Sequence, residues 1–167
     1  MKFIPYYNYS VKIHLSPYEV QEILKKEIEP RKLFRFSGVH SYFEGKISGC
    51  SFKISRIIHY RNSFLPVITG SINQHYAGSE INISFRLNIF TGIFMSIWFS
   101  GVFLAFLFTL PALAGSIQQG RPELHLIIPS GMLAFGYALI YFGFWREQGM
   151  AKRKLDELFD SKQRRDS

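Results

Sequence analysis

Two long uncharged apolar runs constrain the fold of this chain more than any other feature. The first run extends from Ile89 to Ser116 and the second from Leu126 to Trp145, with a short polar break between them. About 20 apolar residues in a helix are enough to cross the hydrocarbon layer of a bilayer. The alternative is a pair of core helices in a soluble protein, but the rest of the chain is too short to enclose them. We therefore expect an integral membrane protein.

The distribution of cations predicts the orientation of these spans. Residues 1–88 hold 12 Lys and Arg and residues 146–167 hold 7, whereas residues 117–125 hold only Arg121. Lys and Arg near the ends of a span resist translocation. Both termini of this multi-pass protein are therefore expected in the cytoplasm.

The formal net charge of +8 has an ordinary explanation in this topology. The cytoplasmic leaflet carries anionic lipids, which attract nearby Lys and Arg, so membrane lipids are expected partners. Nucleic acid is not expected as a partner, because the cations are dispersed and no recognised reader motif accompanies them. The single Cys50 excludes an intramolecular disulfide and fits a reducing compartment.

Composition and pattern divide the chain into three parts. We expect a cytoplasmic α+β domain over residues 1–88, a transmembrane helical hairpin over 89–145 and a cytoplasmic amphipathic tail helix over 146–167. Within the hairpin, the spans are placed at 89–114 and 126–145.

The first domain begins with a strand followed by a well-marked helix. Apolar and polar residues alternate over Asn8–Leu15, as in a half-buried strand. Ser16 and Glu19 then form the S-x-x-E pattern of a capping box, which predicts the start of a helix. Pro30 predicts its end near residue 29, because the residue before a proline avoids helical dihedrals.

From residue 33 onward the pattern becomes β-like, with glycines between alternating apolar stretches. Strands are expected near 33–37, 40–48, 51–60, 66–74 and 80–88. Their short spacings favour an antiparallel meander. A strand, a capped helix and a meander are typical of the front of a helix-grip-like fold, with a pleckstrin-homology-like barrel as the alternative. In the helix-grip-like fold the tail would supply the terminal helix, since Ala151, Leu155, Leu158 and Phe159 share one helical face.

The segment Tyr60-Arg61-Asn62-Ser63-Phe64-Leu65-Pro66 lies among several short motifs of the same region. They are Phe43-x-Gly45 and Phe52-x-Ile54-x-Arg56 before it, and Gly70-x-Ile72 and Gly78-Ser79-x-Ile81 after it. Together these motifs resemble an uncharacterised family of small bacterial two-span membrane proteins, over roughly residues 38–100. The resemblance implies the two-span architecture and a bacterial origin, so the expected location is the bacterial inner (cytoplasmic) membrane. It brings no assigned activity.

One cation falls on the apolar face of a predicted strand. Strict alternation places Arg56 beside Phe52 and Ile54, and burying a guanidinium without a partner is costly. Its partner would be a carboxylate such as Glu44 or Glu80, or a bound anion. We therefore consider an anion or headgroup patch of Arg56, Arg61 and Asn62. The alternative is a bulge that turns Arg56 to solvent.

No catalytic, cofactor or metal site is predicted. The sequence contains no nucleophile elbow, Walker loop or dinucleotide fingerprint, and its five histidines lack the spacing of metal ligands. The expected function is a non-enzymatic, membrane-tethered binding or interaction module. The runner-up is a subunit that self-associates or meets another membrane protein through its hairpin, and a membrane-bound enzyme on a helix-grip-like scaffold comes third.

Small residues recur every four positions on both predicted spans, which is the spacing that lets helices approach closely. They are Ser96 and Ser100 on the first span and Ser130, Ala134 and Ala138 on the second. We expect these residues to pack the hairpin on itself, with self-association as the alternative.

Overall fold

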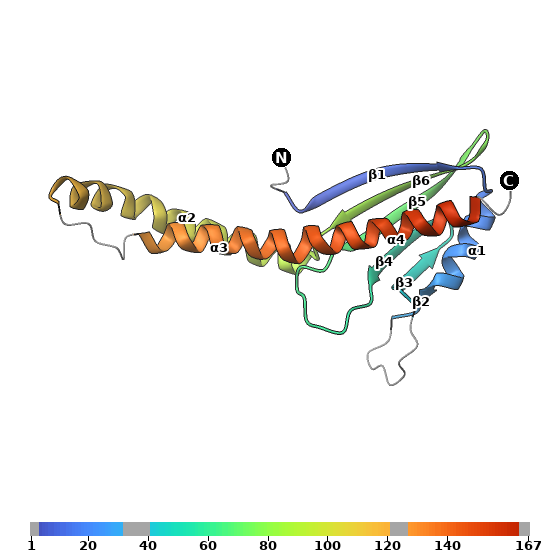
Figure 1. Cartoon of the computed structure of the whole chain (residues 1–167), viewed down its shortest axis with the longest axis horizontal. Helices are drawn as coiled ribbons and strands as arrows, with labels where there is room; N and C mark the ends of the chain where they lie inside the picture. Colours follow the sequence, from blue (N-terminus) through green and yellow to red (C-terminus); the bar gives the residue numbers. More distant parts are fainter. Residues whose placement is uncertain (1–3, 32–40, 121–126, 164–167) are drawn as a thin grey trace. The chain divides into compact units, whose positions relative to one another are not determined.

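The computed structural model describes residues 4–31, 41–120 and 127–163. The chain divides into two compact units (Figure 1). The first, here called the sheet domain, combines residues 1–88 with 143–167, and the second, the helical hairpin, comprises residues 89–142. An α+β architecture followed by two apolar helices and a C-terminal helix is thereby confirmed.

A six-stranded sheet in the order β1-β6-β5-β4-β3-β2 forms the base of the sheet domain. Its strands are β1 (Tyr6–Ile13), β2 (Ile28–Glu29), β3 (Phe43–Ser48), β4 (Ser51–Arg56), β5 (Val67–His75) and β6 (Gly78–Arg86). The expected antiparallel meander is present from β3 to β6. The strand expected at 33–37 lies outside the described residues.

One pairing in the sheet was not predicted, and two element boundaries differ from the prediction. β4 ends at Arg56, where the strand was expected to continue to residue 60. β1 pairs antiparallel with β6, the last strand in the chain, so the sheet order is not the sequence order. Residues 28–29 form a short strand parallel to β3, where the helix was expected to continue to residue 29. The pairing of Ile28 with Phe43 competes with the last helical turn, and it buries both side chains.

Helix α1 (Pro17–Glu27) begins as its capping box predicts. The Ser16 backbone N–H donates to Glu19 Oε2 at 2.7 Å, and the Glu19 backbone N–H donates to Ser16 Oγ at 3.3 Å. These bonds satisfy two donors that a helix start leaves without intrahelical partners. Val20 and Leu24 on the buried side of α1 are fully covered.

The inner face of the sheet is apolar and covered by helices, and the outer face is polar. On β6, Ile81, Ile83 and Phe85 face inward and are buried. Helix α4 (Arg146–Gln163) packs against this face with Ala151, Leu155 and Phe159. The stripe expected on the tail is therefore present, except that Leu158 is half-buried.

The hairpin consists of α2 (Ile89–Gln118) and α3 (Ile128–Ile140). Its tight contact is not the expected one. The ring of Trp98 packs on Gly136, where a Cβ atom would lie 2.3 Å from Trp98 Cζ3. Ser96, Ser100 and Ala134 are exposed, so the expected packing through these three residues is wrong, whereas Ser130 and Ala138 are half-buried. The two helices approach where a glycine faces a large ring instead.

Helix α3 continues into α4 without a break. A π-helical turn, Tyr141–Trp145, joins them, so the second apolar run and the tail form one continuous helix. Phe144 and Trp145 in this turn are buried. A π-helical turn inserts an extra residue and leaves a backbone group without its regular partner, and such turns are frequent at functional sites.

Candidate functional site

The polar centre of the sheet domain is the carboxylate of Glu147 on α4. Its side chain is only 3% exposed. Arg56 Nη1, at the end of β4, donates to Glu147 Oε2 at 2.5 Å, and the Tyr60 hydroxyl donates to Glu147 Oε1. We call Arg56, Tyr60 and Glu147 the Glu147 cluster.

Two further contacts surround the Arg56 guanidinium. Its Cζ atom lies 5.3 Å from the ring centroid of Tyr42, a cation–π distance. Nη1 also contacts Met150 Sδ at 3.5 Å, and Nε is buried without a hydrogen-bond partner in the structure. The guanidinium is therefore held on several sides, and its charge is met by one carboxylate.

The loop between β4 and β5 docks on the π-helical turn. Asn62 Nδ2 donates to the Gly143 carbonyl oxygen at 2.9 Å, and Asn62 Oδ1 accepts from the Phe64 backbone N–H at 2.9 Å. A Cβ atom at Gly143 would lie 2.7 Å from Phe64 Cβ. Glycine at position 143 thus allows the loop to approach the helix closely enough for Asn62 to donate to the Gly143 carbonyl oxygen.

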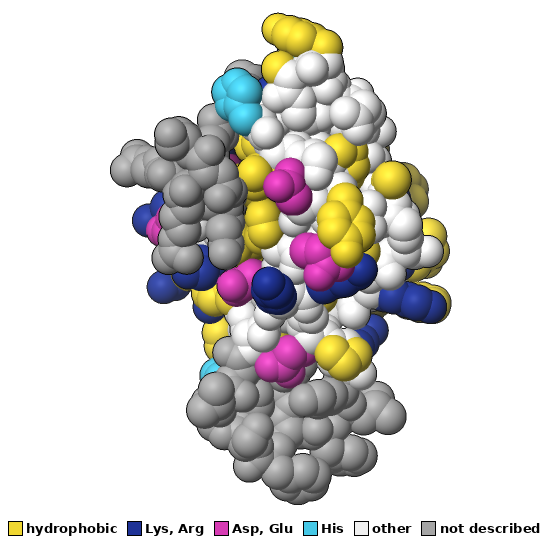
Figure 2. Space-filling model, turned by 90° about the vertical axis from the view of Figure 1, so that its right-hand side faces the viewer, with side chains coloured by type: hydrophobic (Ala, Val, Ile, Leu, Met, Phe, Trp, Pro, Cys, Tyr) yellow, Lys and Arg dark blue, Asp and Glu magenta, His cyan; other side chains and the backbone are white. Residues whose placement is uncertain are grey.

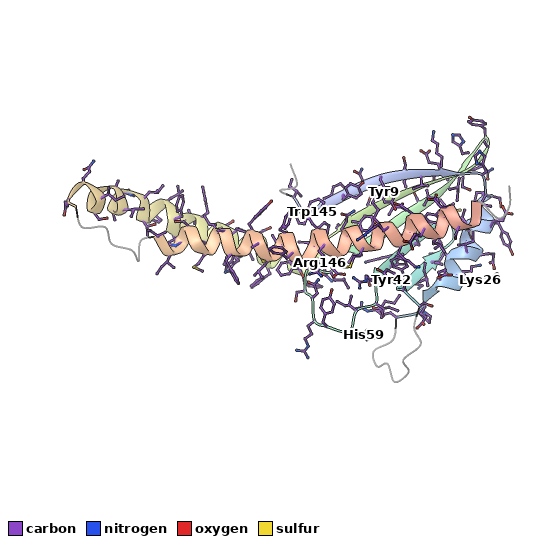
Figure 3. The ribbon with its side chains drawn as sticks, in the orientation of Figure 1. Tyr9, Lys26, Tyr42, His59, Trp145 and Arg146 are labelled. Carbon is purple, nitrogen blue, oxygen red and sulfur yellow. The ribbon has the colours of Figure 1, made fainter. Side chains whose placement is uncertain are left out.

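A second polar group fixes the other side of α4. The Tyr9 hydroxyl of β1 donates to Asp156 Oδ1 at 3.2 Å, and Lys152 Nζ donates to Asp156 Oδ2 at 2.5 Å. Lys152 Nζ also lies 4.6 Å from the Tyr9 ring centroid. We call these three residues the Asp156 cluster. Figure 3 shows Tyr9 and Tyr42 on opposite sides of α4, so the helix is held by polar contacts along both of its flanks.

Both clusters shift the titration of a tyrosine. Burial, and then the charge and hydrogen bond of Asp156, raise the pKa of Tyr9 far above its ordinary value. The hydrogen bond to Glu147 raises the pKa of Tyr60 in the same direction. Both phenols therefore stay protonated and act as hydrogen-bond donors to α4 across the physiological range.

The three residues predicted as an anion patch occupy different environments. Arg56 faces inward, as strict alternation indicates, with 19% of its side chain exposed. The favoured alternative, a bulge that turns Arg56 to solvent, is wrong, because β4 pairs in regular register up to this residue. Its carboxylate partner is Glu147, because Glu44 and Glu80 lie on the outer face of the sheet. Asn62 binds the backbone of Gly143, and Arg61 is exposed. Anion binding by these three residues stays a prediction.

Sequence reasoning missed Glu147, although a signal for it was present. Glu147 stands one helical turn before Ala151, on the same face as the buried stripe of α4. A carboxylate on a buried helical face and a cation on a buried strand face are each costly alone, so they are natural partners. The two residues are 91 positions apart, and pairing them required the placement of α4 on the sheet.

Two further features of the described residues concern the side-chain groupings that hold metal ions and the charge on one face. Within the described ranges, no group of three His, Cys, Asp or Glu side chains is placed to hold a metal ion. On the face seen in Figure 2, acidic and basic side chains are interspersed among hydrophobic ones in the part that is described. That face therefore carries no extended surface of one charge.

Comparisons with known proteins give no assignment. No family model, no curated protein and no solved structure matches this chain.

Proposed function

We propose that this chain is a membrane-tethered binding module of the bacterial inner membrane. In this proposal the helical hairpin crosses the bilayer twice, both termini are cytoplasmic, and the sheet domain meets its partners at the membrane surface. The proposed architecture is helix-grip-like, with α4 as the helix on the concave side of the sheet. A fold of this type carries no function by itself, so the role must be argued from surfaces and packing.

The main support for the proposed membrane tether is that the sheet domain is built from both flanks of the hairpin. Residues 1–88 precede the apolar helices and residues 143–167 follow them, yet they form one compact unit. The Glu147 cluster and the Asp156 cluster each join a strand or loop from the first flank to α4 from the second. This arrangement supports the proposed topology, in which both flanks lie on one side of the membrane and the chain crosses it an even number of times.

The exposure of the hairpin supports insertion into lipid. Helix α2 contains no charged residue, and only 11% of its most apolar window is buried. Phe90 and Phe108 are 79% and 80% exposed. The core helix of a soluble protein would be mostly buried, whereas surfaces as apolar as this one mark contact with lipid or with a partner.

The charge distribution supports the cytoplasmic side. Of the 20 Lys and Arg in the chain, 12 lie in residues 1–88 and 7 in residues 146–167. An excess of cations on one side of the spans is typical of the cytoplasmic side of bacterial inner-membrane proteins.

The filled interior of the sheet domain supports binding at its surface rather than in a chamber. Side chains from both layers meet between the sheet and α4, and Phe85, Leu155 and Phe159 have no exposed area. A side chain lining a water-sized void would retain accessible surface, so these residues are packed against other atoms. A ligand pocket usually combines a sizeable apolar concavity with a few polar groups. The hollow beside Tyr42, about 220 Å³, is instead open at the surface and polar.

Membrane fractionation combined with mild purification tests this proposal. The chain should remain in the membrane pellet after alkaline carbonate extraction and should need detergent to stay in solution. Mass spectrometry of the protein purified in mild detergent should identify co-purified lipids or membrane proteins. A chain that is soluble without detergent would refute the tether.

The exposure of Ser96, Ser100 and Ala134 on the hairpin favours a second candidate, a subunit that self-associates in the bilayer. Ser96 and Ser100 are exposed and donate their hydroxyl hydrogens to carbonyls within α2, so they present small, satisfied surfaces. Residues of this kind allow helices of different chains to approach closely. A ladder of crosslinked species in native membranes would support this candidate, and a monomer alone would exclude it.

A further inference from the structure

A hollow on the outer face of the sheet is not used by any contact described above. It lies over β3, β4 and the start of β5 and encloses about 540 Å³. Its lining is Pro30, Arg31, Glu44, Gly45, Lys46, Lys53, Ile54, Ser55, Val67 and Asn88. All of these residues belong to the sheet domain, and none belongs to the two clusters that hold α4.

The charges around this hollow are unbalanced. Lys46 and Lys53 are directly opposite each other in the antiparallel pair of β3 and β4. Like charges at such positions are destabilising, since their Cβ atoms are only about 5 Å apart. Neither lysine forms an ion pair with a residue that the structure describes. An anion between the two ammonium groups would relieve their repulsion.

A third cation and one carboxylate complete the surroundings. Arg31 is 83% exposed at its side chain, and its Nε atom lies 3.7 Å from Glu44 Oε1. Among the described lining residues, three cations thus accompany one carboxylate. A Cβ atom at Gly45 would lie 2.2 Å from the Lys53 carbonyl oxygen, so the glycine lets β3 and β4 approach closely beside the lysine pair. The hydroxyl of Ser55, at the same rim, adds a neutral donor for an oxygen ligand.

The position of the hollow along the chain indicates the source of the anion. Asn88, in its lining, is the last residue before α2. Ser55 shares this lining with Asn88, and Lys53 precedes Ser55 by two residues on β4. Lys53 is therefore about 7 Å from Ser55 along the strand. If α2 enters the bilayer, the hollow lies within reach of the headgroup layer, which extends roughly 5–8 Å beyond the hydrocarbon core.

We infer that this hollow binds the phosphate of an anionic lipid headgroup, with Lys46 and Lys53 as the principal ligands and Arg31 as a further cation. The inference rests on the proposed membrane tether and specifies its lipid partner. Lysine is a common phosphate ligand and acts as a compact point charge. Binding of this kind would fix the sheet domain against the membrane surface beside the first span.

Binding of short-chain lipids to the full-length protein in a neutral detergent tests the site. The probes are dioctanoyl phosphatidylglycerol, dihexanoyl phosphatidylcholine and inorganic phosphate, each titrated at low and at moderate salt. The test variant is K46Q/K53Q. The matched control is K12Q/K26Q, which removes the same charge from exposed lysines outside the lining.

The site predicts a clear order of affinities. The native chain should prefer phosphatidylglycerol to phosphatidylcholine, K46Q/K53Q should weaken phosphatidylglycerol binding about tenfold or more, and K12Q/K26Q should change it less than about twofold. Equal binding by K46Q/K53Q and the native chain would overturn the site. Inorganic phosphate that binds as tightly as the lipid would overturn the lipid as its source.

The proposed membrane tether and the proposed headgroup site can be refuted by different results. Carbonate extraction of the same variants reports membrane insertion without reference to lipid binding. A chain that stays in the membrane but binds phosphatidylglycerol no better than phosphatidylcholine refutes only the headgroup site. A chain that leaves the membrane refutes the proposed function itself.

Discussion

Phenylalanine side chains occupy opposite environments in the two units. In the sheet domain, Phe43, Phe85 and Phe159 are at most 2% exposed, whereas Phe90 and Phe108 of the hairpin are 79% and 80% exposed. The first group is removed from water by the protein's own packing, and the second group stays exposed, as the proposed insertion into lipid would require. The burial of large apolar side chains thus differs between the two units, which meet in the sequence after Asn88 and before Gly143.

Large-to-small substitutions should separate the two units most strongly. Phe159→Ala opens a cavity in the sheet domain and should lower its free energy of unfolding by about 3–5 kcal/mol. The matched substitution Phe108→Ala, on the exposed side of α2, should leave the stability of the sheet domain nearly unchanged. Hydrogen exchange of the β5 and β6 amides in detergent would measure both effects. Equal losses would show that the division into two units is wrong.

Removal of the buried charge in the Glu147 cluster should have the next largest effect. Glu147→Gln leaves Arg56 buried against a neutral partner and should cost about 2–3 kcal/mol of domain stability. Glu157→Gln on the same helix, where the side chain is 67% exposed, should cost less than about 0.5 kcal/mol. The free energies of unfolding of the two variants, from denaturant titration in detergent, provide the measurement. A similar small cost for both would mean that the cluster does not hold α4.

Two glycines of the continuous helix give a smaller and more local contrast. Gly143→Ala places a Cβ atom 2.7 Å from Phe64 Cβ and should destabilise the docked loop by about 1–3 kcal/mol. At Gly149 a Cβ atom meets nothing within 4 Å, so Gly149→Ala should raise stability by about 0.5–1 kcal/mol. Limited proteolysis of the β4–β5 loop and thermal unfolding would report the two opposite signs. Stabilisation by both substitutions would show that the loop does not require Gly143.

The smallest expected effect is the contribution of the Asp156 cluster to the loss of domain stability at alkaline pH. Because the pKa of Tyr9 is raised in the folded domain, an unfolded chain releases this proton first as pH rises above about 10. The stability contributed by Tyr9 is therefore complete below that pH and is lost as pH rises through and above it. Tyr9→Phe should cost about 1 kcal/mol at neutral pH and should show a shallower loss of stability between about pH 10 and 11.5. Parallel stability curves for the two proteins would place Tyr9 outside the cluster.

Local sequence signals predicted those parts of the fold that depend on neighbouring residues. The capping box of Ser16 and Glu19, the alternation on β6 and the apolar stripe of α4 are each contained in a short segment. Their physical causes, which are hydrogen bonding within one helical turn and periodic burial, act over a few residues. These predictions were therefore confirmed.

The long-range pairings could not be predicted in the same way. The pairing of β1 with β6 and the contact between Arg56 and Glu147 depend on which surfaces meet after the chain folds. The short parallel strand β2 depends on the position of β3, and the contact of Trp98 with Gly136 depends on how the hairpin packs. Spacing alone placed Ser96 and Ser100 in the hairpin contact because it ignores the size of the facing side chain.

Site-specific labelling of introduced cysteines tests the central claim, that two halves of one domain meet on the same side of a membrane. In a Cys50→Ser background, single cysteines would replace the exposed residues Lys12, Gln119 and Glu157 in turn. A membrane-impermeant maleimide added to intact cells should label the chain with the substitution at Gln119 and should spare those at Lys12 and Glu157. In inverted vesicles the pattern should reverse. Labelling of Lys12→Cys and Glu157→Cys from opposite sides would contradict the account.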